Sequence, residues 1–273
     1  QVYPKNKYHC YFVNDASTDN TAKILDSFNN YEHITVIHHE KNLGLSSARN
    51  TGINKCNADF IAFLDGDMVV GNDWIESFLP YFNKSTIAVM GDNIPPTDLK
   101  LSPVEKYYFS NIRGARQFND GDNISLQYML YNNAMVKRPA LLKSGLFDEN
   151  ITKYGGEDTD LSAKIWNMYP HCFIYSKKSN SVHYHRRSLS GFCSSMNTYG
   201  RYNLPILIDR YPQHKTKFGA DWIFSIKGYL LFNSILSTVI QLGVYIFPAQ
   251  LFIRYMVVSA VISGARKSVE FHK

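Results

Sequence analysis

The chain has 273 residues, of which 45% are apolar and 19% charged, and its net charge is +6. This composition excludes disordered and fibrous proteins, and the length suits one domain of about 200 residues with an appendage. The four cysteines show no CxxC spacing, which predicts neither a zinc site nor a disulfide framework and favours a reducing compartment.

The positive charge is concentrated in one part of the chain. Between Lys164 and Lys217 there are nine basic residues and a single acid, Asp209. Such a belt suits the phosphates of a nucleotide, a nucleic acid or anionic lipid headgroups. Charge alone does not choose among these partners.

The first elements form a strand, a helix and a second strand. Residues 8–13 (YHCYFV) predict a strand, which ends in the turn and N-cap formers of residues 14–19. Apolar residues at helical spacing follow at Ile24, Leu25 and Phe28, and residues 33–37 predict the next strand. This strand–helix–strand order predicts a parallel sheet.

A glycine-containing loop precedes the next helix. Residues 38–50 (HHEKNLGLSSARN) lead into a helix through Cys56, with Gly44 just before a serine-rich start. Free amides at such a helix start, together with the positive charges of Lys41 and Arg49, suit a diphosphate. The alternative is a plain helix cap with basic residues on the surface.

Paired acids end the next strand. The apolar run 60–64 (FIAFL) predicts a buried strand, and Asp65-Gly66-Asp67 follows it directly. Because ligands bind at the carboxyl ends of strands in open α/β sheets, these two acids suggest a hard cation clamped onto phosphate oxygens. The alternative is an acidic turn in which Gly66 supplies the bend. A helix over 72–81 and a strand over 86–90 continue the alternation.

A second acidic cluster lies further along the chain. A helix over 104–118, a strand over 132–136 and a short helix over 138–144 lead to a glycine-hinged loop and a helix through Met168. Glu157, Asp158 and Asp160 lie at the start of that helix, where its dipole favours negative charge. Three acids are more than a cap requires, so one of them could serve as a general base if the loop faces Asp65 and Asp67.

Histidines alternate in residues 182–188 (VHYHRRS), at the end of a strand that precedes a helix over 189–202. His183 and His185 therefore lie on the same strand face, which suits a metal with one of the two as its ligand. The alternative is a pair of solvated histidines beside basic residues.

The last part of the chain is apolar. No charged residue occurs from Gly228 to Ile253, and Lys227, Arg266 and Lys267 flank the apolar part. The segment is long enough for one membrane span or for a hairpin broken at Pro248, and its polar residues also suit a monotopic amphipathic anchor. The flanking cations favour an anionic cytoplasmic leaflet, so we expect the protein at the cytoplasmic face of a membrane.

Four segments, in order, resemble family 2 glycosyltransferases of the GT-A fold. They are NDASTDNT at 14–21, KNLGLSSARNTGI at 41–53, FLDGD at 63–67 and GGEDTDLSAKIW at 155–166. The resemblance implies an α/β fold with a Rossmann-like, mostly parallel central sheet flanked by helices, followed by the C-terminal apolar helical segment. It divides the chain into a catalytic domain over 1–204, a basic linker over 205–227 and a membrane-associated segment over 228–273.

The resemblance also implies an inverting, metal-dependent sugar transfer. It assigns Asp158 as the base that deprotonates an acceptor hydroxyl and Asp67 as a ligand of Mn²⁺ or Mg²⁺, with His183 as a second metal ligand and His185 as the runner-up. It also implies that Asp15, Gly44, Arg49 and Asp65 bind the sugar donor. The donor is a nucleotide sugar, and a UDP-sugar is the first candidate. The implied acceptor is a glycan or a polyprenyl-linked sugar, and nucleic acid is not an expected partner.

Two expectations concern what this chain lacks. The family's first strand is expected before residue 1, so the sequence predicts an N-terminally truncated chain. The alternative function is a catalytically silent nucleotide-sugar-binding or scaffold protein at a membrane, and the intact Asp65, Asp67 and Asp158 argue against it.

Overall fold

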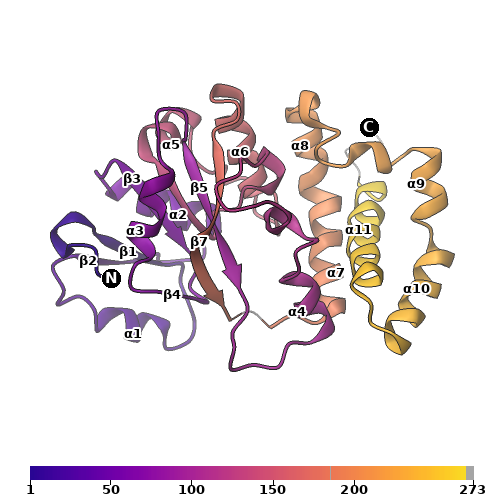
Figure 1. Cartoon of the computed structure of the whole chain (residues 1–273), viewed down its shortest axis with the longest axis horizontal. Coiled ribbons are helices and arrows are strands. Elements are labelled where there is room, and N and C mark those ends of the chain that lie inside the picture. Colours follow the sequence, from indigo (N-terminus) through magenta and orange to yellow (C-terminus); the bar gives the residue numbers. More distant parts are fainter. Residues whose placement is uncertain (185, 269–273) are drawn as a thin grey trace.

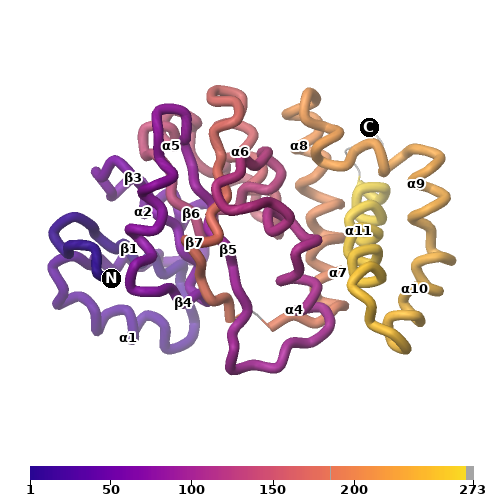
Figure 2. The backbone as a smooth tube through the Cα atoms, in the orientation of Figure 1, coloured from indigo at the N-terminus to yellow at the C-terminus, as the bar shows by residue number. Residues whose placement is uncertain are grey.

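The computed structural model describes residues 1–184 and 186–268. A small sheet near the N-terminus, a larger sheet flanked by helices and a group of helices at the far end follow one another along the molecule (Figure 1). The chain leaves the larger sheet after its last strand and continues into the group of helices, which it does not leave again (Figure 2).

The strands are β1 (Cys10–Asn14), β2 (Ile34–His38), β3 (Phe60–Leu64), β4 (Met68–Val70), β5 (Ala88–Ile94), β6 (Asn133–Lys137) and β7 (Phe173–His183). The helices are α1 (Thr21–Asp26), α2 (Leu45–Lys55), α3 (Trp74–Phe78), α4 (Pro103–Tyr108), α5 (Arg138–Ser144), α6 (Glu157–Met168), α7 (Leu189–Thr198), α8 (Leu204–Arg210), α9 (Ile226–Leu231), α10 (Ser234–Ile246) and α11 (Gln250–Arg266). A π-helical segment, Tyr199–Asn203, joins α7 to α8.

The strands form two sheets. Strands β1 and β2 pair in parallel, and the second sheet has the order β3-β6-β5-β7-β4. Within the second sheet only β5 and β7 are parallel, because β6 runs antiparallel to both of its neighbours and β4 runs antiparallel to β7. The prediction of one mostly parallel sheet is therefore wrong. Apolar periodicity identifies a strand but carries no information on its direction.

The first and second sheets are not joined by hydrogen bonds between strands in the part of the chain that the structure describes. Strand β1 belongs to one sheet and β3 to the other. The strand expected before residue 1 concerns residues outside this sequence, so it stays a prediction.

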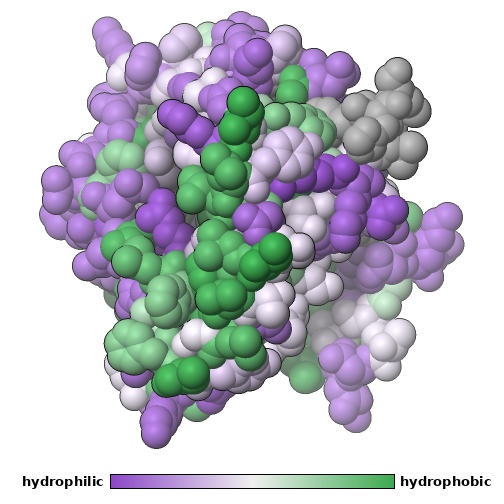
Figure 3. All heavy atoms as spheres, turned by 90° about the vertical axis from the view of Figure 1, so that its right-hand side faces the viewer, coloured by the Kyte–Doolittle hydropathy of each residue, from purple (hydrophilic) through white to green (hydrophobic). Residues whose placement is uncertain are grey.

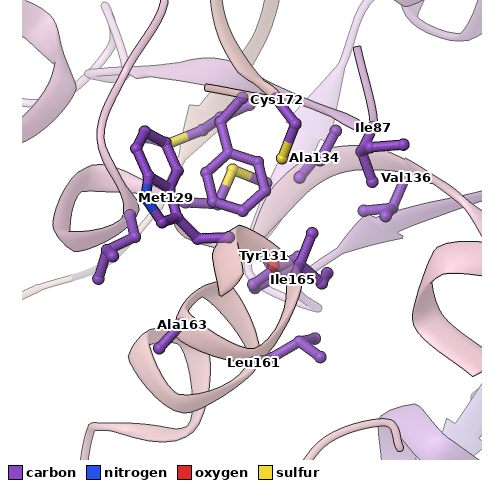
Figure 4. Close-up of a cluster of buried hydrophobic side chains, with 14 of the residues drawn as sticks. Ile87, Met129, Tyr131, Ala134, Val136, Leu161, Ala163, Ile165 and Cys172 are labelled. Atoms are coloured by element: carbon purple, nitrogen blue, oxygen red, sulfur yellow. The ribbon is translucent and has the colours of Figure 1, made fainter. Parts of the chain in front are cut away.

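Helices cover both faces of the larger sheet, as expected for an α/β fold. On one face, Trp74 and Phe78 of α3 pack against Val89 and Met135. On the other face, Leu161 and Ile165 of α6 belong to the same buried core as Ala134 and Val136 of β6, and Figure 4 labels these side chains. This second core fixes the start of α6, which carries the second acidic cluster.

The segment expected as a basic linker, residues 205–227, is packed against the larger sheet's core. Leu207 of α8 is fully buried in that core, and Tyr211 is almost so. Arg210, one of the basic residues of the segment, contacts Asp148 at 2.8 Å and Asp160 at 2.6 Å. These contacts make α8 part of the same folded unit.

The C-terminal helices pack onto α7. Ile253 and Val257 of α11 share a core with Phe192 of α7 and with α4. The two backbones approach closely at Gly200 and Gly264, where an added Cβ would lie 2.1 Å from a carbonyl oxygen of the other segment. No helix within residues 1–184 and 186–268 is both long enough and apolar enough to cross a bilayer. A membrane span, one of the possibilities for the apolar segment, is therefore not found among these residues.

Candidate active site

Asp15 connects the end of β1 to the loop before α2. Its Oδ1 accepts a hydrogen bond from the amide of Leu43 at 2.8 Å and lies 2.8 Å from His39 Nδ1, and its Oδ2 accepts from the amide of Gly44 at 2.7 Å. Burial acts to raise the pKa of this carboxyl, but the donors around it hold the pKa below its usual value. Asp15 is therefore ionised and holds the Gly44 loop in place.

Gly44 allows the chain to enter α2 in this position. Its φ of +92° is one that residues with a Cβ rarely adopt. Helix α2 then starts at Leu45, and Ala48 donates to the carbonyl of Gly44 at 3.0 Å. Asp15 and Gly44, two of the residues predicted to bind the nucleotide sugar, are thus brought together. Helix α2 carries another of these residues, Arg49, one turn further on.

Arg49 joins the two acidic clusters. Its Nη2 lies 3.0 Å from Asp65 Oδ1 and its Nη1 lies 2.8 Å from Asp158 Oδ1. The arginine side chain is only 8% exposed, and its guanidinium lies over the ring of Phe147. Two carboxylates that are 93 residues apart in the sequence therefore share one buried cation.

Asp158 is held at both of its oxygens. Arg49 contacts Oδ1, and the amide of Tyr131 donates to Oδ2 at 3.2 Å. Burial raises the pKa of Asp158 above its usual value, although the charge of Arg49 acts in the opposite direction. A buried carboxylate with a raised pKa is a stronger base than an exposed one, as general base catalysis requires.

Its neighbour Glu157 was not selected from the sequence. Burial, followed by the charge of Asp158, raises the pKa of Glu157 to about 7. The sequence placed Glu157 in the acidic cluster but gave no sign of its burial. The third acid of the cluster, Asp160, has a structural role, because it is fully buried and paired with Lys164 and Arg210.

The antiparallel pairing of β4 with β7 places Asp67 beside His183. Met68 is the partner of His183 in this pairing, and the amide of Tyr184 donates to the carbonyl of Asp67 at 2.9 Å. As a result His183 Nε2 lies 3.2 Å from Asp67 Oδ2. The sequence did not predict β4, so this contact depends on a strand that only the structure reveals.

These two side chains fit a metal that shares its coordination with a substrate. A carboxylate oxygen and an imidazole nitrogen are both ligands of Mn²⁺, and Mg²⁺ is commonly held by one or two carboxylates with substrate phosphates and water. Among the described residues no group of three or more His, Cys, Asp or Glu side chains could hold a metal by itself. His185, the runner-up ligand, lies outside the described residues.

The predicted site residues thus fall into three contact groups that follow one another around α2 and β3. They are Asp15 with Gly44, Arg49 with Asp65 and Asp158, and Asp67 with His183. Arg49 lies on α2, which begins directly after Gly44, and Asp65 and Asp67 belong to the same turn. The sequence did not single out His39, and it did not distinguish Glu157 within its acidic cluster. It also missed the aromatic ring of Tyr108, whose centroid is 5.8 Å from that of His183.

This combination of fold and side chains is that of a glycosyltransferase. Residues 1–145 match the family model described as glycosyl transferase family 2, so the chain belongs to that family. It is 30% identical over 182 residues to the pre-mycofactocin glycosyltransferase of Mycobacterium tuberculosis, covering 66% of this chain and 38% of that protein. It is 28% identical over 189 residues to glycosyltransferase GlyA of Streptococcus pneumoniae, covering 65% of this chain and 26% of that protein. The chain therefore spans well under half the length of these curated relatives.

Solved structures confirm an α/β fold of the GT-A type. The structure of TarS residues 1–349 from S. aureus superposes with a TM-score of 0.56 at 15% identity, covering 100% of this chain and 85% of that one. The mannosyltransferase PcManGT from Pyrobaculum calidifontis, in complex with GDP-Man and Mn²⁺, superposes with a TM-score of 0.64 at 16% identity, covering 97% and 78% of the two chains. At these identities the likeness concerns the fold.

Proposed function

We propose that this chain transfers a sugar from a nucleotide diphosphate sugar to a hydroxyl group of its acceptor, with inversion at the anomeric carbon. The observation that carries the proposal is the position of Asp158, whose carboxylate is buried, held at both oxygens and connected through Arg49 to Asp65. Membership of glycosyl transferase family 2 supports the reaction class.

In this reaction Asp158 accepts the proton of the acceptor hydroxyl. The freed oxygen attacks the anomeric carbon from the face opposite the phosphate, the bond from that carbon to the phosphate oxygen breaks, and the nucleoside diphosphate leaves with the electron pair. Arg49 keeps Asp158 ionised, and the amide of Tyr131 fixes the orientation of the carboxylate. Both contacts are made by the protein's own groups, so the base is preorganised.

The donor is held by the residues around α2. Asp15 accepts hydrogen bonds from the amides of Leu43 and Gly44 and so fixes the loop before α2. The first turn of a helix suits a diphosphate. Asp67 and His183 would hold Mn²⁺ or Mg²⁺ beside the diphosphate. When bound, the metal neutralises charge on the leaving nucleoside diphosphate. Related folds bind UDP-GlcNAc in TarS and GDP-Man in PcManGT, which makes UDP- and GDP-sugars the first donors to test.

We further propose a glycan or polyprenyl-linked acceptor and a location at the cytoplasmic face of a membrane. The apolar residues after Lys227 and the cations that flank them support a membrane surface. A polyprenyl-linked acceptor would be presented at that surface.

This function is tested by incubating the 273-residue chain with nucleotide sugars and measuring the nucleoside diphosphate that is formed. UDP-GlcNAc, UDP-glucose and GDP-mannose are each supplied with Mn²⁺, and water serves as acceptor where no sugar acceptor is known. The proposal expects release that depends on the metal and is lost in Asp158→Asn and in Asp67→Ala, with unchanged circular dichroism. Donor binding with no release under any condition would support the catalytically silent alternative, and unchanged turnover in both variants would refute the assigned roles.

A further inference from the structure

An apolar surface covers the end of the molecule that lies farthest from the two sheets. We call it the apolar end face and define it by six aliphatic side chains, each at least 60% exposed. They are Ile226 and Leu230 of α9, Ile235, Leu242 and Ile246 of α10, and Leu251 at the start of α11. Figure 3 looks directly at this end of the molecule and shows hydrophobic side chains gathered over it. Monomeric proteins in water rarely leave so many large apolar side chains exposed together.

The orientation of α10 creates this surface. Ser237 Oγ lies 2.8 Å from Ser259 Oγ of α11 and 3.3 Å from the hydroxyl of Tyr255, so its polar side chain faces the protein. Ile235, Leu242 and Ile246 are spaced by 7 and 4 residues, which places them on one helix face. That face points away from α11. Val244 packs inward against the core of α11 and α7, so α10 carries apolar side chains on both its inner and its outer side.

The neighbouring helix α11 has apolar residues buried inside the protein. Ile253, Val257 and Ile262 of α11 are buried against α7 and its surroundings. Helix α10 has no buried residue, and its 13 residues correspond to about 20 Å at a rise of 1.5 Å per residue. The hydrocarbon core of a bilayer is about 30 Å thick. A bilayer could therefore cover α10 from the side, with the helix lying in the plane of the interface.

The charge of this region selects a lipid surface over a second copy of the chain. From Trp222 to Ser268 there is no Asp or Glu, and four cations are present: Lys227, Arg254, Arg266 and Lys267. A twofold dimer brings the same patch of both copies together. The cations of one copy would then face the cations of the other. Anionic lipid headgroups would neutralise them instead.

Aromatic side chains add to this match. Tyr229 is 51% exposed and Tyr245 is 80% exposed, and both belong to the helices that carry the apolar end face. Arg266 lies over the ring of Tyr229, with its Cζ 4.1 Å from the ring centroid. Tyrosines and cations around an apolar surface are typical of protein segments at the boundary of headgroups and acyl chains.

We propose that the apolar end face docks this protein onto an anionic bilayer, with α9 and α10 lying in the interface and the two sheets on the aqueous side. The inference rests on the membrane location proposed above and identifies the surface that makes the contact. It requires no helix to cross the membrane, in agreement with the lengths of the described helices.

Vesicle flotation of the full chain tests this surface. Vesicles of phosphatidylcholine with 30% phosphatidylglycerol, on the order of the anionic content of a cytoplasmic leaflet, are compared with vesicles of phosphatidylcholine alone. We expect binding that is clearly tighter to the anionic vesicles. The variant Leu242→Glu/Ile246→Glu is expected to weaken binding by at least roughly tenfold for each residue, because each substitution removes an aliphatic side chain that the bilayer would bury. The matched control Ile24→Glu/Leu142→Glu changes two exposed aliphatic residues elsewhere and is expected to bind normally.

A second pair of variants tests the charge. Lys227→Gln/Lys267→Gln removes two exposed cations and is expected to weaken binding to the anionic vesicles by about fivefold for each charge. Binding to phosphatidylcholine alone is expected to change little. The control Lys5→Gln/Lys84→Gln removes two exposed cations at the opposite part of the chain and is expected to leave both affinities unchanged.

Two results would overturn the proposal. One is the absence of binding to either kind of vesicle. The other is a dimer in sedimentation velocity that Leu242→Glu/Ile246→Glu dissociates, which would assign the apolar end face to self-association. Release of nucleoside diphosphate in vesicle-free buffer is measured alongside. Lost vesicle binding with normal release refutes only the docking surface, whereas normal vesicle binding without release refutes only the proposed transfer reaction.

Discussion

Arg49 Nη1 lies 2.8 Å from Asp158 Oδ1, and the other terminal nitrogen of the same guanidinium contacts Asp65. A residue of α2 thereby connects the turn after β3 to the first turn of α6. The single positive charge of the buried arginine is shared between these two carboxylates. This contact decides both the stability of the site and the ionisation of the proposed base.

Removing the arginine is expected to destabilise the fold. Arg49→Met leaves Asp158 buried without its cation, and breaking a buried pair in this way costs about 3–5 kcal/mol. Urea unfolding at pH 7.5 measures this loss. The double variant Arg49→Met/Asp158→Asn is expected to recover part of it, because the uncompensated charge is gone. Lys178→Met, at a pair with Asp120 in which the lysine side chain is 77% exposed, serves as the control and is expected to cost at most about 1 kcal/mol. A loss of less than about 1 kcal/mol in Arg49→Met would contradict the bridging role.

The identity of the base is open to a direct comparison of neighbours. Asp158→Asn is expected to lower kcat by about 10²–10⁴-fold with little change in the KM of the donor, because the variant cannot accept the proton of the acceptor. Glu157→Gln is expected to retain most of the activity. Steady-state kinetics with the best donor measures both, and the reverse pattern would make Glu157 the base.

The free energy of unfolding is expected to depend on pH because of Glu157. Its pKa is about 7 in the folded protein and has an ordinary value of 4.5. Between these two values the folded state binds one proton more than the unfolded state, so stability falls as the pH rises from about 4.5 to about 7. The loss for this group is on the order of 2 kcal/mol. Unfolding in urea at pH 5 and pH 7.5 is expected to show a smaller difference for Glu157→Gln than for the parent. Equal differences would show that Glu157 does not titrate in this range.

Metal binding can be followed without turnover. A ligand that binds only the folded state raises the melting temperature. Mn²⁺ together with UDP is therefore expected to stabilise the parent chain, and Asp67→Asn and His183→Gln are each expected to reduce the shift. Asp73→Asn, an exposed acid of the same region that caps no helix through its side chain, is the control. A full shift in Asp67→Asn would remove Asp67 from the metal site.

The packing of α11 on α7 requires glycine at position 264. A Cβ at Gly264 would lie 2.1 Å from the carbonyl oxygen of Asn197. Gly264→Ala is therefore expected to destabilise the protein by about 1–3 kcal/mol, since a backbone atom must move. At Gly243 of α10 the nearest atom to an added Cβ belongs to Phe252 at 3.5 Å, an ordinary contact. Gly243→Ala is expected to be neutral or to stabilise by up to about 1 kcal/mol. Thermal unfolding of both variants measures the contrast.

The sequence by itself determined most of the local structure and the residue types of the site. Strand β3 and helix α5 have the bounds that the sequence predicts, because an uninterrupted apolar run and a proline start with a glycine end are local signals. Four segments that resemble family motifs, in the same order along the chain, also predicted sugar transfer. Asp15, Gly44, Arg49, Asp65, Asp67, Asp158 and His183 were all named from the sequence. The comparisons support the family, and the individual roles stay predictions.

The tertiary structure alone decided which of these residues meet. Strand β4 is three residues long and carries too short a pattern to predict, yet its pairing with β7 brings Asp67 to His183. The direction of β6, and with it the mixed character of the sheet, follows from pairing between segments far apart in the chain. The burial of Glu157 and the outward apolar face of α10 likewise depend on what packs around them. Local sequence encodes propensity, whereas direction, burial and exposure are properties of contacts between distant residues.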